Sequence, residues 1–555
     1  MSRARAAIFI GALVASAACT RGTPPVTTAI VNARVWTGDS ARPWAEAVSI
    51  AGERIAAVGT SDEIRAGLPA TARVIDAGGA MVTPGFIDSH VHFLVGGRAL
   101  ASVQLRDAAT RDEFVRRIAA HARTLAKGAW ITNGDWDHQR WGGELPTRAW
   151  IDSVTPDNPV WINRLDGHMN LANSLALSAA GVTRDTKDVA GGTIVRDAAG
   201  DPTGILKDNA QSLVDRAVPD PSPAEWDRAL DTAMTYVAER GVTSVHHMGT
   251  WDDLAVFKRN HAAGRLRTRI VAQVPISTWE RLRDTVKADG VGDAWLRWDG
   301  LKGFVDGSLG SHTAAMLEPF TDSPKDSGFF VTPPESLYAW VKGGDAAGLR
   351  LIVHAIGDRA IRTQLDVFER VAAENGARDR RFRIEHAQHI APPDVPRFAK
   401  IGVIASMQPY HAIDDGRWAE RVIGHERAKG TYAFRSLLDA GATLAFGSDW
   451  FVAPPTPLEG IQAAVTRRTL DGKNPGGWIP EQKITLEEAL RAYTRDAAYA
   501  GFQERDVGVL KPGMLADIVV LDRDLTAVPP ETIADAKVRA TIVGGRVVYE
   551  AATPK

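Results

Sequence analysis

The chain has 555 residues, of which 45% are hydrophobic and 24% are charged, a composition typical of an ordinary globular protein. The formal net charge of -2 gives no electrostatic reason to expect a nucleic acid as partner. A chain of this length is too long for one ordinary hydrophobic core but is compatible with a large barrel plus a smaller domain.

The first 19 residues resemble an export signal. Arg3 and Arg5 precede an uncharged, mostly apolar stretch (6–18), and small residues lead to Cys19, the only cysteine. This order is typical of a secretory signal, and a cysteine at this place resembles a bacterial lipoprotein signal. We therefore expect export to the periplasm or cell surface with a lipid anchor on Cys19; plain secretion and a leader without function are the alternatives. A disulfide or a cysteine-ligated metal is excluded in the mature protein.

A short linker (20–27) is followed by strand-like runs separated by Gly and Asp turns, which predict a small β-sheet over 28–84. Similar runs return over 501–555. The two ends are expected to form one composite β-sandwich domain that is interrupted by everything between them. The alternative is two unrelated β-rich appendages.

Strand-like and helix-like runs alternate between residues 85 and 500, which predicts parallel strands joined by crossover helices. At this length a (β/α)₈ TIM barrel, an α/β fold, is the economical arrangement, and its site residues belong at the carboxyl ends of the strands. The strand candidates after the first are 129–132, 160–163, 242–245, 269–272, 301–305, 351–354, 383–386, 402–405 and 443–446.

His90 and His92 end the apolar run 81–92, which begins as a strand. Because residues i and i+2 of a strand point to the same face, both imidazoles can face one metal ion. Taken alone the pair is a weak signal, since surface or packing histidines show the same spacing.

Further candidate ligands stand at the ends of later strand candidates. His354 closes 351–354, His386 closes 383–386, Asp449 follows 443–446, and Lys302 lies within 301–305. Histidine and carboxylate are suitable ligands for zinc and similar divalent ions. Their joint placement on separate, ordered strand ends predicts a metal site.

At this point the sequence resembles the amidohydrolase superfamily and, within it, the YtcJ-like branch. The resemblance covers about residues 28–550 and is carried by GFIDSHVH (85–92), DGHMNLANS (166–174), LKGFVDGSLGSHTAAM (301–316), HAIGDRA (354–360), IEHAQ (384–388), FGSDW (446–450) and VGVLKPGMLADIVVLD (507–522). It implies a barrel inserted in a composite β-sandwich. It also implies metal-dependent hydrolysis of a small-molecule substrate at a carbon–nitrogen bond other than a peptide bond, in a small amide, an N-acyl or N-formyl compound or a cyclic amide.

The resemblance implies a role for each ligand candidate. His90 and His92 look like ligands of the more buried metal, and His354 and His386 like ligands of the more exposed one. Lys302 looks like a carboxylated lysine that bridges two ions, since a lysine near two dications can be neutral and add carbon dioxide. Lys207 is the alternative candidate for the carboxylated lysine. If Lys302 is unmodified, we expect a site with one metal ion. Zinc is the expected metal, with iron, manganese and cobalt open.

The implied mechanism is attack by a metal-bound hydroxide, with Asp449 as the base that passes the proton to the leaving nitrogen. His168, in the motif 166–174, is expected either to stabilise the oxyanion or to hold the substrate; a structural role is the alternative. Ester or carbamate hydrolysis and ring deamination would use the same residues. A ligand-binding lipoprotein without activity is a further alternative, and a homodimer is expected only by analogy.

Four features point more weakly to substrate binding. His411 follows a strand candidate and is expected to line the pocket. His312 stands where relatives usually carry arginine. Trp136 belongs to a tryptophan cluster in 130–161 that either forms an aromatic pocket or packs the early strands. The Gly-rich segment 307–330 is either a mobile lid or a static loop.

Overall fold

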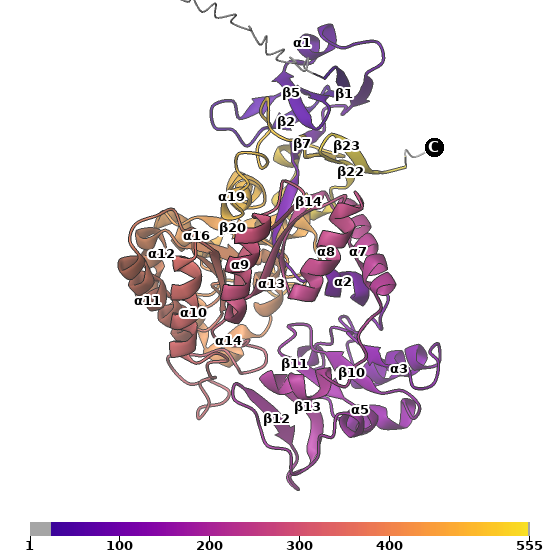
Figure 1. Ribbon diagram of the computed structural model, residues 1–555, viewed down its shortest axis with the longest axis vertical. Helices are drawn as coiled ribbons and strands as arrows, with labels where there is room; N and C mark the ends of the chain where they lie inside the picture. The colour runs from indigo at the N-terminus through magenta and orange to yellow at the C-terminus, as the bar shows by residue number, and fades with distance from the viewer. Residues whose placement is uncertain (1–23, 553–555) are drawn as a thin grey trace, which may run out of the picture.

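The computed structural model describes residues 24–552, so the expected leader and Cys19 lie outside the described residues. Three parts follow one another along the longest axis (Figure 1): a β-rich domain, a barrel, and a third unit built from residues 100–222. None of the helices in the described range is long and apolar enough to cross a membrane.

The central part is a nearly closed eight-stranded parallel barrel, as the sequence predicted. Its strands, in sheet order from the last to the first, are β20 (Leu444–Phe446), β19 (Ile404–Met407), β18 (Arg383–His386), β17 (Arg350–Ala355), β16 (Leu296–Phe304), β15 (Arg269–Pro275), β14 (Val242–Met248) and β8 (Phe86–Val91). Two backbone hydrogen bonds cross the seam between first and last strand. Asp449 N donates to His90 O at 2.7 Å, and His92 N donates to Trp450 O at 2.6 Å.

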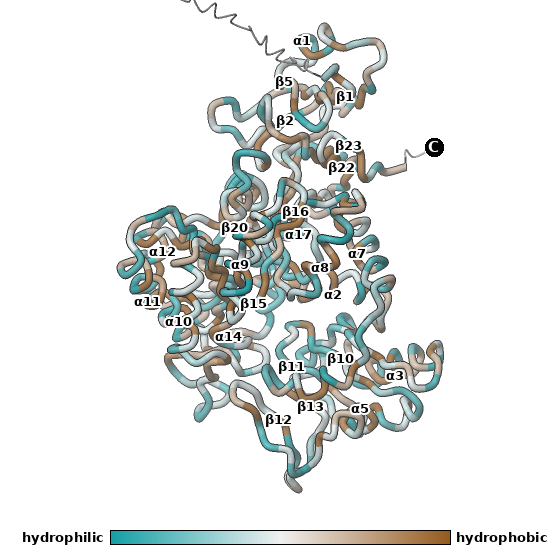
Figure 2. The backbone as a smooth tube through the Cα atoms, in the orientation of Figure 1, coloured by the Kyte–Doolittle hydropathy of each residue, from teal (hydrophilic) through white to brown (hydrophobic). Residues whose placement is uncertain are grey.

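Helices that lie between or after the barrel strands surround the barrel. They are α2 (Phe93–Ala99), α7 (Pro223–Ala238), α8 (Trp251–Ala262), α9 (Trp279–Asp289), α10 (Pro334–Ala346), α11 (Asp358–Asn375), α12 (Val395–Ile401), α13 (Pro409–Asp415), α14 (Ala419–Ile423), α15 (His425–Ala428), α16 (Phe434–Asp439), α17 (Pro457–Thr466), α18 (Leu486–Ala492) and α19 (Arg495–Ala500). Ser222, Thr250 and Thr485 begin α7, α8 and α18 with capping boxes, which satisfy backbone N–H groups at the helix start. Hydrophobic and hydrophilic stretches alternate along these helices (Figure 2), as expected of helices with one face on a core.

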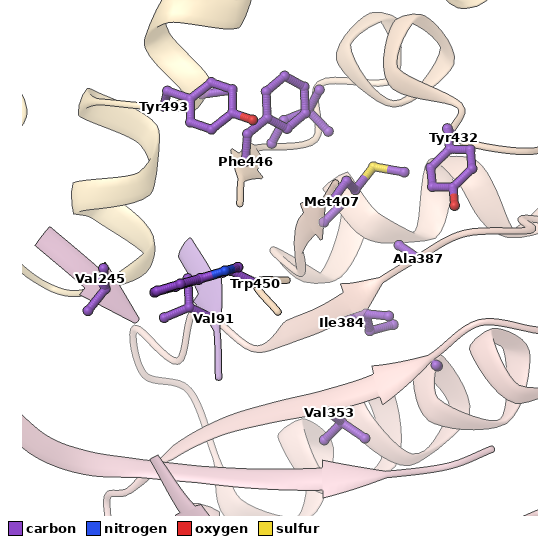
Figure 3. Close-up of a cluster of buried hydrophobic side chains, with 14 of the residues drawn as sticks. Val91, Val245, Val353, Ile384, Ala387, Met407, Tyr432, Phe446, Trp450 and Tyr493 are labelled. Carbon is purple, nitrogen blue, oxygen red and sulfur yellow. The ribbon is translucent and has the colours of Figure 1, made fainter. Parts of the chain in front are cut away.

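A cluster of buried hydrophobic side chains joins the barrel strands to the helices and loops around them (Figure 3). Val91, Val353 and Ile384 are fully buried members of this cluster. Each lies next in sequence to a polar residue of the same strand. Because side chains alternate between the two faces of a strand, these polar neighbours point to the opposite face. The same alternation that fills the hydrophobic layer therefore turns the polar residues toward the barrel interior.

Both ends of the chain contribute to one β-rich domain. Strand β7 (Met81–Pro84) pairs antiparallel with β21 (Ile518–Leu521), so the N-terminal and C-terminal strands share a sheet rather than forming two appendages. That sheet has the order β23 (Arg546–Glu550), β22 (Val538–Val543), β21, β7, β2 (Arg34–Trp36), β3 (Trp44–Ala45), and the other has β5 (Arg54–Gly59), β4 (Ala47–Ala51), β1 (Val26–Val31), β6 (Arg73–Asp76), with α1 (Ser61–Ala66) beside it.

The third unit corrects the prediction for 129–132 and 160–163, which are not barrel strands. They lie in a separate five-stranded sheet of order β12 (Gly192–Arg196), β13 (Pro202–Asp208), β11 (Met169–Ala172), β10 (Val160–Asn163), β9 (Ile131–Thr132), with helices α3 (Arg111–Ala122), α4 (Arg148–Ile151), α5 (Ser174–Ala179) and α6 (Ser212–Asp215). An apolar run of four residues looks the same in a parallel barrel and in a mixed sheet. The unit leaves the barrel after α2 and returns at α7.

Candidate metal centre and active site

His90, His92 and Asp449 meet at the carboxyl end of the barrel. The Nε2 atoms of His90 and His92 lie 3.4 Å and 3.3 Å from the same oxygen, Oδ1 of Asp449. His90 sits on the first strand, and Asp449 follows the last one. Asp449 adopts a left-handed backbone conformation (φ +60°), which is uncommon for a residue other than glycine and often occurs at functional sites.

A second group of potential ligands shares Asp449. Ligand atoms of His386, His411 and Asp449 all lie within 4.8 Å of one another, as do those of His90, His92 and Asp449. The His386 and His411 rings are parallel, with centroids 6.5 Å apart. His411 was predicted only to line the pocket, and the structure brings it into a ligand group.

His354 lies beside this second group without belonging to it. Its ring centroid is 4.5 Å from that of His386, but its Nε2 is 3.0 Å from the carbonyl oxygen of Gly307. Only Nδ1 of His354 is therefore free to face the other histidines. The resemblance pairs His386 with His354, which stays a prediction; among the described residues, His411 is the histidine whose ligand atom lies within 4.8 Å of those of His386 and Asp449.

Lys302 is buried, and its Nζ has no hydrogen-bond partner among residues 24–552. Burial lowers the pKa of this lysine to about 8, so part of it is neutral near physiological pH. The competing Lys207 lies on β13 in the third unit, where its Nζ donates to the carbonyl of Ser311 at 2.8 Å. Of the two lysines, Lys302 is the one with an uncommitted amine.

The donor set fits a divalent cation. His90 Nε2, His411 Nε2 and Asp449 Oδ1 are buried, and none has a hydrogen-bond partner in the described part of the chain; such orphaned atoms are rare unless an ion or water meets them. Burial lowers the pKa of His90 and His386 well below the usual value, so both are neutral, as metal ligands must be. Burial alone would raise the pKa of Asp449, but the imidazoles of His90 and His92 lower it to about 2.

Outer contacts fix the histidine rings. Nδ1 of His90 is 2.5 Å from Oε2 of Glu385, and Nδ1 of His386 is 2.9 Å from Oε1 of Gln408. Glu385 also receives hydrogen bonds from Arg383, at 2.9 Å and 3.1 Å, and from Ser406 at 2.9 Å. Contacts of this kind orient metal-binding histidines and set which nitrogen faces the ion.

The third unit places His168 opposite the ligand groups. Its Nδ1 is 2.6 Å from Oδ1 of Asp208, and its ring centroid is 5.1 Å from that of His354. Burial lowers the pKa of His168, but the hydrogen bond to Asp208 and the negative charges of Asp208, Asp166 and Asp306 together outweigh burial and raise it. Asp208 also has a left-handed φ of +46°. The pair presents a fixed imidazole to the cavity.

One cavity joins the barrel and the third unit above the ligand groups. The third unit contributes a set of mainly charged residues, and the barrel loops contribute the rest of the wall. The lining residues are Asp137, Arg164, Leu165, Asp166, His168, Ser308, Leu309, Gly310, His354, Ile356, His386, Gln388, His411, Asp414, Asp415, Trp418, Asp449 and Val452.

Two expected substrate-binding residues are not part of this wall. Trp136 is fully buried, and its indole N–H donates to the Ile162 carbonyl at 3.0 Å. It belongs to the core of the third unit, so it packs the early strands rather than forming a pocket. His312 lies 2.9 Å from Asp322 through its Nε2. The start of 307–330 nevertheless lines the cavity.

Several residues of the site carried no role in the sequence analysis. Glu385 was part of a quoted motif, and its position two residues after Arg383 on one strand face was the available signal. Asp415 lies four residues after His411, which places the two on one face if the segment is helical. Asp208 and Gln388 had no periodic or spacing signal, because their positions depend on how separate segments come together.

A model of the amidohydrolase family matches residues 73–549. The chain is 42% identical over 533 residues to protein LONG AFTER FAR-RED 3 of Arabidopsis thaliana, covering 94% of this chain and 91% of the relative. It is 32% identical to the putative amidohydrolase YtcJ of Bacillus subtilis (86% and 90% covered). It is 31% identical to the N-substituted formamide deformylase of Arthrobacter pascens (94% and 98% covered).

Solved structures agree with these relatives. An uncharacterized metal-dependent hydrolase from Pyrococcus furiosus is 29% identical with a TM-score of 0.70, and it covers 91% of this chain and 99% of its own. Its counterpart from Pyrococcus horikoshii is 27% identical with a TM-score of 0.72 and the same coverage. The likeness extends over the barrel and the β-rich domain alike.

Proposed function

The chain belongs to the amidohydrolase family, and on that premise we propose that it hydrolyses carbon–nitrogen bonds other than peptide bonds with the help of a divalent metal. The substrates are small amides, N-acyl or N-formyl compounds, or cyclic amides, and water converts each into a carboxylic acid and an amine, which stay in one molecule when the amide is cyclic. A relative named for its activity, an N-substituted formamide deformylase that is 31% identical, supports this class of bond.

The observation that carries the proposal is the set of unpartnered atoms at the seam of the barrel. Nε2 of His90 and Oδ1 of Asp449 are buried without a partner in the described chain, and Nε2 of His92 lies beside them. Leaving such groups unpaired costs about 1–3 kcal/mol each. A bound cation would satisfy them together.

In this proposal His90, His92 and Asp449 hold one ion, and His386 with His411 or His354 holds a second. Zinc suits this set of ligands. Carboxylated Lys302 would bridge the two ions, since its free amine is buried with no other partner in the range 24–552. When bound, the metal polarises the substrate carbonyl and lowers the pKa of a coordinated water.

The side chains of the site divide the remaining work. Asp449, ionised at neutral pH, takes the proton of the attacking water and delivers it to the leaving nitrogen. His168 is held by Asp208 at 2.6 Å and faces the cavity from the third unit, where it stabilises the negative charge that develops on the carbonyl oxygen. Closure of the cavity by the third unit limits the access of bulk water.

The metal content per chain tests the centre. We expect two ions per chain in the wild-type protein and one or none in the Lys302→Ala variant, with loss of hydrolysis of simple N-formyl and N-acyl compounds. One ion in both proteins would instead indicate a mononuclear hydrolase with a structural Lys302. No metal in either protein after reconstitution would contradict the proposal and favour a ligand-binding protein.

Ester or carbamate hydrolysis and ring deamination remain alternatives on the same residues. A matched set of an amide, an ester and a carbamate with the same alkyl group on the nitrogen or oxygen separates the first two from the proposal, because the kcat/KM values report which bond the site favours. Release of ammonia from an amino-substituted heterocycle tests ring deamination. We expect the amide or formamide to give the highest value relative to its uncatalysed hydrolysis.

We further propose that the protein is exported and anchored by a lipid on Cys19. The proposal is supported by the order of basic, apolar and small residues before that cysteine. Metabolic labelling with a palmitate analogue tests it, with Cys19→Ala as the control. Label on the wild-type protein alone supports the anchor, and absence of label with processing at another residue indicates plain secretion.

A further inference from the structure

Helix α13 carries Asp415, an acidic residue without a role in the proposed hydrolysis, into the cavity. His411 and Asp415 are four residues apart on this helix and therefore lie on one face, about 6 Å apart along the axis. Both line the cavity. His411 belongs to a ligand group, so Asp415 stands one helical turn further from the strand end.

The hydrogen-bond partners of Asp415 are neutral. Its Oδ2 accepts from the Tyr432 hydroxyl at 2.6 Å and from Nε2 of Gln388 at 2.9 Å. Its Oδ1 accepts no hydrogen bond, and its carboxylate forms no ion pair, with any residue in the range 24–552. Asp415 is half-buried, and a carboxylate in such a place without a cationic partner gains from a ligand that supplies the missing charge.

Gln388 adds a second acceptor. It is 4% exposed, and its Nε2 contacts both the Asp415 carboxylate and, at 3.1 Å, Nε2 of His389. A carboxylate only accepts hydrogen bonds, so this contact fixes the orientation of the amide. Oε1 of Gln388 is left without a partner in the described chain, on a side chain that lines the cavity.

The other carboxylates of the outer wall are neutralised. Arg164 contacts Asp166 at 2.5 Å and Asp137 at 3.5 Å, and Arg417 contacts Asp137 at 3.3 Å and also Asp414. With Asp415 the outer wall has four carboxylates and one guanidinium group, Arg164, and Arg417 pairs with two of the carboxylates from outside the lining. The charges of both arginines act on Asp415 without an ion pair, while Asp414 repels its charge and the Tyr432 hydroxyl donates to it at 2.6 Å. The wall therefore attracts a cation.

Building on the proposed hydrolysis, we propose that Asp415 Oδ1 and Gln388 Oε1 form a subsite for a protonated amine on the part of the substrate remote from the scissile bond. The preferred substrates are then N-acyl or N-formyl compounds that carry an ammonium group. A carboxylate or phosphate at this place would be repelled, and an alkyl group would leave both oxygens unpaired.

Two substrates of the same length test the subsite in the metal-loaded enzyme. N-formyl-1,4-diaminobutane ends in an ammonium group, and N-pentylformamide carries a methyl group in its place. We expect a kcat/KM ratio of about tenfold or more in favour of the cation, from one charge-assisted hydrogen bond. Asp415→Asn should lower that ratio at least tenfold, and Gln388→Met should lower it in the same direction.

The matched control is Asp366→Asn, which removes one charge from the exposed side of α11 and should leave the ratio unchanged. Equal kcat/KM values for the two substrates in the wild-type enzyme, or an unchanged ratio in Asp415→Asn, would overturn the subsite while leaving the proposed hydrolysis intact. If the wild-type enzyme hydrolyses neither compound, nor any other simple amide, the proposed function fails instead. Calorimetric binding of 1-aminobutane against 1-butanol then decides the subsite: amine binding that Asp415→Asn abolishes supports it, and no preference for the amine overturns it.

Discussion

Replacing Glu385 by glutamine should have two separate effects: a lower metal affinity and a lower free energy of unfolding. The carboxylate accepts from His90 at 2.5 Å, from Arg383 at 2.9 Å and 3.1 Å, and from Ser406 at 2.9 Å. Glutamine has one accepting oxygen and adds an NH₂ group that cannot face Arg383 or the His90 N–H. The buried Arg383 loses its counter-charge, which costs about 3–5 kcal/mol of unfolding free energy.

The effect on the metal follows from the orientation of His90. Loss of an outer hydrogen bond to a ligating histidine typically lowers metal affinity by about 10–100-fold, or about 1.4–2.8 kcal/mol. Zinc affinity is measured by competition with a chelating dye, and stability by urea unfolding of the metal-free protein. Glu369→Gln is the control, because that carboxylate forms only partly exposed ion pairs on the protein surface, worth about 0–1 kcal/mol. Zinc affinity of Glu385→Gln within twofold of the wild-type value would refute the role given to Glu385.

Three further outcomes are expected. Asp449→Asn should lower kcat by about 10²–10⁴-fold and reduce zinc content, because both ligand groups share this residue; unchanged activity and metal would sink the mechanism. Burial, reinforced by Asp414, raises the pKa of Asp415 to about 7, so the preference for the cationic formamide should be present above pH 7 and disappear below it as the carboxyl is protonated; a ratio that is constant from pH 6 to 8.5 would argue against this assignment. Asp517→Asn should cost about 3–5 kcal/mol of unfolding free energy, because it breaks a buried two-point contact with Arg269 at 2.7 Å and 2.9 Å; urea unfolding checks it, and a loss below 1 kcal/mol would count against it.

The barrel was predictable because its signal is local and repeated. Apolar runs that end in a polar residue alternate with helical stretches, and the run 351–354 and strand β17 (Arg350–Ala355) nearly coincide. The run 160–163 carried the same signal but belongs to the third unit. Pairing direction depends on which segment lies alongside, and here the antiparallel neighbour is the strand at 169–172. A single run holds no information about its neighbour.

The candidate site was predictable to the extent that its residues end strands. His90 and His92 follow from their spacing, and Asp449 from its place after the last strand. Glu385 and His386 are neighbours on one strand, and alternation predicts that only one of the two faces the site. Both contribute to it, and His386 has a left-handed φ of +67°. Asp415 belongs to a helix of seven residues, too short for its periodicity to stand out.

The hydrogen bonds that close the barrel have a consequence for how the protein is made. They join His90 to Asp449 and His92 to Trp450, so the contacts that seal the cylinder also bring the ligands of the first ion together. A nascent chain that has not yet presented its last strand has two histidines but no third ligand. In the proposed metal centre an ion would therefore be held by all three ligands only after the last strand has joined the first, and a bound ion would oppose separation of these two strands.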